Sequence, residues 1–73
     1  MSESLEFKLN GAEYIELKNL LKVTGLCGSG GAAKAVIDEG QVSVDGLKEI
    51  RKSFKVMAGQ SVVFDGHSIK VLA

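Results

Sequence analysis

A serine followed by two glycines, with a lysine about one helical turn further on, is the most chemically suggestive spacing in this 73-residue chain. The residues are Ser29, Gly30, Gly31 and Lys34. Serine is a favoured first residue of a helix, because its hydroxyl can accept a hydrogen bond from a free amide of the first turn. Glycines in that turn would leave the backbone amides uncovered, so that a phosphate could approach them and Lys34 could close over it.

Two structural explanations of the glycine pair are also open. Glycine within a helix costs about 0.5–1 kcal/mol relative to alanine, so two in succession require a reason. Another segment could pack closely against Gly30 and Gly31, or the two residues could belong to an extended loop that enters the helix. The sequence contains no GxxxxGK[ST] phosphate loop, which would be a more specific signal.

A basic stretch, KEIRKSFK at residues 48–55, is the second candidate for chemistry. Residues 1–47 carry four lysines and seven acidic residues, and residues 48–73 carry five basic and two acidic ones, so a neutral chain has a basic second part. The basic residues of the stretch 48–55 are Lys48, Arg51, Lys52 and Lys55. Lysine contacts phosphate without directional preference, whereas arginine can bind it with two parallel hydrogen bonds. The stretch therefore predicts a local basic face, with a solvated loop as the alternative.

The remaining reactive side chains do not indicate an enzyme. His67 is the only histidine and is expected to be a packed or half-exposed structural residue, and Asp38 and Glu39 are expected to be solvated at a helix end. Cys27, the only cysteine, is expected to be a small packing residue. A single cysteine excludes an internal disulfide and the usual metal clusters, so no metal or other cofactor is expected.

Composition predicts a single small domain over residues 1–73. The hydrophobic fraction of 45% is sufficient for a core, although this length is near the lower limit for a fold without disulfides or metals. Neither a signal peptide nor an apolar run of about 20 residues is present, so no membrane contact is expected. The cysteine usage is typical of the cytoplasm.

The first part of the chain must position these residues with a strand and a helix. Alternating apolar residues predict a strand over 5–9, and Asn10-Gly11 predicts a tight turn that returns the chain through residues 13–15 as a hairpin. Helical spacing of leucines predicts a helix over 17–24 that ends at Gly25. Among the few aromatic residues, Tyr14 and Phe54 are the candidates for exposure and for stacking on nucleobases, but by residue type both are expected in the core.

The sequence from Ser29 onward predicts one more helix and three strands. The helix begins at Ser29 and ends at Gly40, with Ala33, Val36 and Ile37 buried and with Lys34 and Asp38 in solvent. A strand over 42–44 follows, turned by Asp45-Gly46, and a strand through 62–64 joins a last strand at 67–72 by Asp65-Gly66. The predicted fold class is α+β, with two short helices packed on a small, mainly antiparallel sheet.

The spaced residues of this pattern resemble the S-four-type RNA-binding domain, whose helix–helix–strand unit is called the αL motif. The matching segments are LKNLL at 17–21, Gly25-Leu26, SGGAAK at 29–34, Ile37, GQVSVDG at 40–46 and KVMAGQSV at 55–62. Within the family, the chain is most similar to a stand-alone bacterial subfamily with SGG at the helix start and a basic string after the Asp-Gly turn.

The resemblance implies a non-catalytic module that docks structured RNA, often ribosomal RNA, through the second helix and the adjoining loop. Ser29 falls on the usual capping serine, Lys34 on a common RNA-contacting position, and Lys55 on the basic residue before the Val-x-x-Gly turn. Many members carry basic residues where this chain has Gly30 and Gly31, and Arg51 and Lys52 are expected to compensate.

Two functions are therefore compared. The first is an RNA-binding module that recognises the shape and backbone of RNA with Ser29, Gly30, Gly31, Lys34, Lys48, Arg51, Lys52 and Lys55. The second is a protein-interaction module that docks a partner protein or a second copy of itself, which the neutral net charge favours. The chain offers no indication of its oligomeric state.

Overall fold

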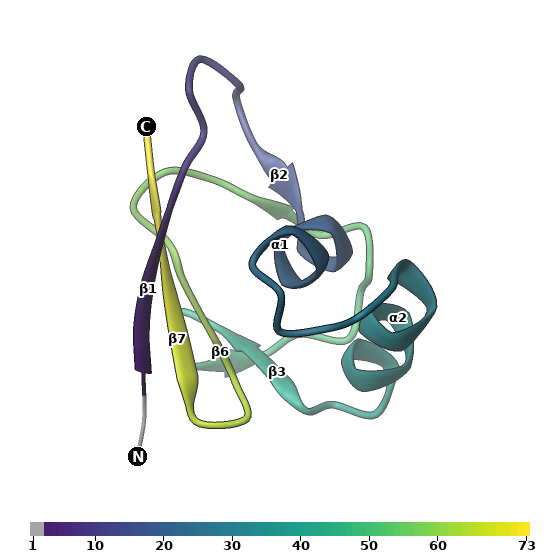
Figure 1. Ribbon diagram of the computed structural model, residues 1–73. Coiled ribbons are helices and arrows are strands. Elements are labelled where there is room, and N and C mark those ends of the chain that lie inside the picture. Colours follow the sequence, from purple (N-terminus) through teal and green to yellow (C-terminus); the bar gives the residue numbers. More distant parts are fainter. Residues whose placement is uncertain (1–2) are drawn as a thin grey trace.

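The computed structural model describes residues 3–73 and places both helices against one face of a five-stranded sheet (Figure 1). The elements are β1 (Glu3–Lys8), β2 (Ile15–Glu16), α1 (Leu17–Val23), α2 (Gly30–Asp38), β3 (Val42–Val44), β4 (Leu47–Lys48), β5 (Lys55–Val56), β6 (Ser61–Phe64) and β7 (His67–Leu72). The strand order of the large sheet is β1-β7-β6-β3-β4, and β2 pairs with β5 in a separate two-stranded sheet. The predicted fold class is confirmed.

The core lies between the helices and the large sheet. α1 contributes three fully buried leucines, and α2 contributes Ala33 and Ile37. Alternate residues of the sheet complete it, namely Val42, Val44, Val62, Phe64, Ile69 and Val71. Burial on every second strand residue is the pattern of a sheet with one covered face. No helix in the described part of the chain is long and apolar enough to cross a membrane.

The strand pairing is antiparallel with one exception. β3 pairs with β4 and β6, and β6 pairs with β7, all antiparallel. β1 instead runs parallel to β7, from Glu3 opposite His67 to Lys8 opposite Leu72. The predicted turns at Asp45-Gly46 and Asp65-Gly66 are confirmed, and both aspartates have a φ of 52°.

The predicted hairpin after β1 is wrong. Asn10 and Gly11 do turn the chain, with φ values of 52° and 95°, but the next strand pairs with β5 instead of β1. α1 already begins at Leu17, so a returning strand could offer β1 only a few residues, whereas β7 offers a ladder of six. The amide of Leu9 extends that ladder by donating to the carbonyl of Leu72 over 2.8 Å.

Both predicted helices are confirmed, together with the residues that end them. α1 is followed by Thr24, whose hydroxyl donates to the Leu20 carbonyl over 2.8 Å, and then by Gly25 with a φ of 81°. Ser29 is the N-cap of α2, and its hydroxyl accepts a hydrogen bond from the Ala32 amide over 3.1 Å. Gly40, with a φ of 78°, lies two residues beyond the end of α2.

Candidate functional site

The first turn of α2 exposes its backbone. Gly30 and Gly31 lie within the helix, so the explanation that they form an extended loop is wrong. The explanation by close packing is also wrong: among residues 3–73, a Cβ added at Gly30 would meet no heavy atom within 4 Å, and one at Gly31 would meet only the Ser29 hydroxyl at 3.8 Å. Neither glycine has a positive φ. The remaining explanation is that amides of this helix start are left uncovered, and it concerns Gly30 and Gly31, because the Ala32 amide donates to the Ser29 hydroxyl.

The basic loop, which we define as residues 49–55, is held against the start of α1. Within the described chain, no side chain caps α1; its first amides donate instead to carbonyls of the loop. Leu17 donates to Phe54 over 2.9 Å and Lys18 donates to Lys52 over 3.2 Å. At the beginning of the loop, the Glu49 amide donates to the Val42 carbonyl over 3.0 Å. The loop therefore presents its side chains from a fixed backbone.

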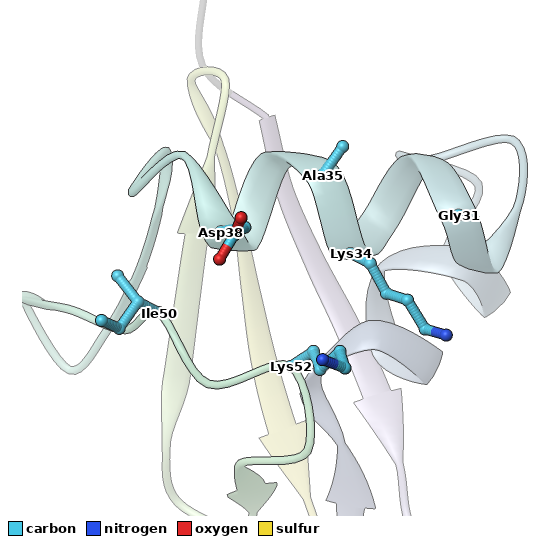
Figure 2. A pocket seen from close by; sticks show the side chains of 6 residues that line it. All are labelled: Gly31, Lys34, Ala35, Asp38, Ile50 and Lys52. Atoms are coloured by element: carbon cyan, nitrogen blue, oxygen red, sulfur yellow. The ribbon is translucent and has the colours of Figure 1, made fainter.

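Two adjoining hollows bring most of the predicted site residues together. The first, of about 320 Å³, lies between α2 and the basic loop and is lined by Gly31, Lys34, Ala35, Asp38, Ile50 and Lys52. Figure 2 shows the Lys34 side chain extending from α2 on the side where the loop carries Lys52. The second hollow, of about 600 Å³, is lined by residues 50–55 and shares Ile50 and Lys52 with the first.

We call Lys34, Arg51, Lys52 and Lys55 the basic strip, because they line these two connected hollows. All four are exposed. Asp38 is the one acidic residue among those that line the hollows. The strip is thus a positively charged surface on a protein whose net charge is zero.

Lys48 lies in neither hollow. Its side chain crosses Gly40 beyond the end of α2, where a Cβ on the glycine would lie only 3.0 Å from the Lys48 Cδ. A helix of nine residues spans about 13 Å, so Lys48 is separated from the glycine pair by the length of α2. The structure does not bring Lys48 together with the other predicted site residues.

Arg51 already has an anionic partner. Its Nε lies 2.9 Å from Glu49 Oε2 and its Nη2 lies 3.2 Å from Oε1, while its amide donates to Oε2 over 3.0 Å. These hydrogen bonds from Arg51 lower the pKa of the Glu49 carboxyl. The guanidinium also lies 5.3 Å from the centroid of the Phe54 ring. The two-pronged contact expected between Arg51 and phosphate is therefore made, in the free protein, with a carboxylate.

Of the two aromatic residues expected in the core, only Phe54 packs against it. Tyr14 is 38% exposed, so that expectation is wrong. Its ring faces the basic strip, with Lys55 Nζ 5.0 Å from the ring centroid. The sequence did contain a signal for this: Ile15 packs on the core, so the residue beside it in an extended segment points outward.

The other reactive side chains have structural positions. Cys27 is buried, and burial raises the pKa of its thiol, which confirms the prediction of a packing residue. His67 is half-buried at the start of β7, and Asp38 and Glu39 are exposed as expected. In residues 3–73, no group of three or more histidine, cysteine or acidic side chains is placed to hold a metal ion.

Comparison with known proteins identifies the family. The profile of the S4 domain matches residues 7–72, nearly the whole chain, and the protein therefore belongs to the S4 domain family. It is 51% identical over 67 residues to the "Putative RNA-binding protein YbcJ" of Escherichia coli strain K12, covering 92% of this chain and 96% of the relative. An uncharacterized YbcJ protein of Shigella flexneri matches at the same identity and coverage.

A solved structure shows the same fold. The solution structure of E. coli YbcJ, described as revealing an αL motif involved in RNA binding, superimposes with a TM-score of 0.76 at 49% identity. The match covers all of this chain and 92% of the other. The αL motif predicted from the sequence is thus confirmed.

Proposed function

We propose that this protein binds structured RNA, with ribosomal RNA as the expected class, through the phosphate backbone at the start of α2 and along the basic strip. The observation that carries the proposal is the bare first turn of α2 beside two converging lysines. Gly30 and Gly31 have neither a conformational nor a packing role, and Lys34 and Lys52 line the hollow that begins at Gly31. The name of the YbcJ relative as a "Putative RNA-binding protein" and the description of its αL motif as involved in RNA binding support the same proposal.

The physical basis is the positive end of a helix combined with fixed cations. Uncovered amides and the helix dipole at the α2 start favour an anion. Lysines along the strip neutralise further phosphates and release counterions, which makes binding depend on salt. Contacts of this kind set position and affinity but carry little base sequence, so RNA shape is the expected determinant.

The test is a titration with structured ribosomal RNA fragments at several salt concentrations. The variant is Lys34→Gln, Lys52→Gln and Lys55→Gln, and its matched control removes the same charge type from the sheet at Lys8 and Lys70, both exposed. Each lost phosphate contact lowers the slope of log affinity against log salt by about 0.7–0.9, so the triple variant should lose about 2 to 3.

The control should bind like the parent if the basic strip is the site. Losses in proportion to the charges removed, three in the variant and two in the control, would show that affinity follows only net charge, and would overturn the location. Absence of binding by the folded parent at low salt would overturn RNA binding itself.

A protein partner is the second candidate, favoured by exposed apolar side chains. Leu47 is 75% exposed on β4, and Ile50 is 60% exposed between the two hollows. An interface built on these residues should survive the triple lysine variant and be lost in Leu47→Ser with Ile50→Ser. The two candidates are therefore separated by whether the triple lysine variant or the Leu47→Ser, Ile50→Ser variant abolishes binding.

A further inference from the structure

An exposed aromatic ring lies at the end of the basic strip and has no part in the proposed phosphate contacts. Tyr14 is 38% exposed, and the ammonium of Lys55 lies 5.0 Å from its ring centroid. Lys55 also lines the second hollow. The lysine therefore connects the ring to the surface that is proposed to bind phosphate.

The position of the ring is set by the β2–β5 ladder. In that ladder Ile15 lies opposite Val56, and both pack in or against the core. Tyr14 directly precedes β2 and Met57 directly follows β5, and both side chains are exposed. Met57 is 52% exposed, so an apolar side chain accompanies the ring on the outer face of this small sheet.

We propose that Tyr14, with Lys55 and Met57 beside it, is a stacking site for an unpaired nucleobase of the bound RNA. This inference rests on the proposed function and extends it to the kind of RNA that is bound. A single nucleotide carries both an anionic phosphate and an aromatic base, which match the ammonium of Lys55 and the ring of Tyr14. Stacking on an aromatic ring is open to every base, so the site adds affinity without requiring a particular sequence.

The site distinguishes RNA structures from one another. In a continuous duplex, both faces of each base are occupied by neighbouring bases, whereas bases in loops, bulges and ends can be splayed onto protein side chains. The preferred ligand is therefore a helix, whose phosphates contact the basic strip, with an unpaired nucleotide next to it. The attraction between the Lys55 ammonium and the Tyr14 ring holds the two groups together before RNA arrives, which reduces the ordering required on binding.

The experiment compares four forms of one RNA stem. One is blunt, and the other three carry an unpaired 2-aminopurine nucleotide at the end of the stem, in a bulge or in a closing loop. The parent should bind at least one unpaired form about 5- to 10-fold more tightly than the blunt stem. Tyr14→Phe, which keeps the ring, should retain that preference, and Tyr14→Ala should abolish it. Quenching of 2-aminopurine emission should follow the same order.

A second readout comes from the protein. Tyr14 is the only tyrosine and the chain has no tryptophan, so its intrinsic emission reports this ring alone. Emission should fall when an unpaired form binds and should stay unchanged with the blunt stem.

Equal affinity of the parent for all forms, with Tyr14→Ala binding like the parent, would overturn the stacking site. Salt-dependent binding that is lost in the triple lysine variant would then leave the proposed function intact. If the folded parent bound none of these RNAs at low salt, both proposals would fail together.

Discussion

Replacing both glycines of the α2 start by alanine should raise the stability of the protein while weakening its binding to RNA. Neither Gly30 nor Gly31 has a positive φ, and among the described residues an added methyl group would meet at most the Ser29 hydroxyl at 3.8 Å. Alanine therefore fits without strain and gains about 0.5–1 kcal/mol per position, about 1–2 kcal/mol in total. For a domain of this size, the melting temperature should rise by about 4 to 16 °C.

The same methyl groups should hold a phosphate away from the helix amides. A hydrogen bond to a charged group contributes about 1.5–3 kcal/mol, so the loss of one such contact predicts an affinity lower by about 10- to 160-fold. The assays are thermal unfolding followed by circular dichroism and an RNA titration at constant salt. The crossed control is Ala32→Gly, in the same exposed turn, which should lower the melting temperature and leave the affinity unchanged.

Opposite changes in stability and affinity are the signature of a functional glycine pair. A Gly30→Ala, Gly31→Ala protein that melts higher and binds RNA like the parent would refute the reasoning that these amides contact phosphate. A variant that melts lower would instead show that the first turn of α2 requires glycine for its conformation.

Four further predictions concern the charges near the site and the side-chain hydrogen bonds of Gln60. Glu49→Gln should free the Arg51 guanidinium and steepen the salt dependence of RNA binding by about 0.9 in slope, as seen by fluorescence anisotropy. Arg51 lowers the pKa of Glu49, so their pairing supports the fold at neutral pH. This contribution should be lost progressively as the pH falls from the ordinary carboxyl pKa through the lowered one, and the acid titrations of parent and Glu49→Gln should converge below it. Asp38→Asn should strengthen binding, whereas Glu6→Gln on distant β1 should not, and equal gains would show an effect of net charge alone. Gln60→Ala should lower the free energy of unfolding, measured in urea, by about 1 kcal/mol. The Gln60 side chain lies in the turn before β6, where it accepts a hydrogen bond from the Met57 amide and donates one to the Asp45 carboxylate.

The parts of the fold that follow from neighbouring residues could be predicted from the sequence. Gly25, Ser29 and Gly40 mark the helix ends, and Asp65-Gly66 joins two alternating strands, so the helices and the last hairpin were located correctly. Each of these signals acts within a few residues, where backbone preference and capping dominate.

The parts that were not predicted depend on residues distant in the chain or on side-chain geometry. The Asn-Gly turn favours a local hairpin, and only the sixfold ladder with β7 reveals why β1 pairs elsewhere. The charge pattern located the basic strip but could not show that Arg51 is bound to Glu49 or that Lys48 lies beyond the end of α2. Tyr14 was placed by residue type, although the neighbouring Ile15 carried the information that it faces solvent.

The parallel pairing of β1 with β7 has a consequence for the order in which the sheet folds. Glu3 lies opposite His67, 64 positions further along the chain, so pairing of the two strands closes a loop that spans nearly the whole described fold. Contacts between such distant residues close slowly, because the intervening chain must be ordered first. The helices and the β3–β6–β7 meander can assemble earlier, and we expect β1 to be added last, as the step that completes the sheet.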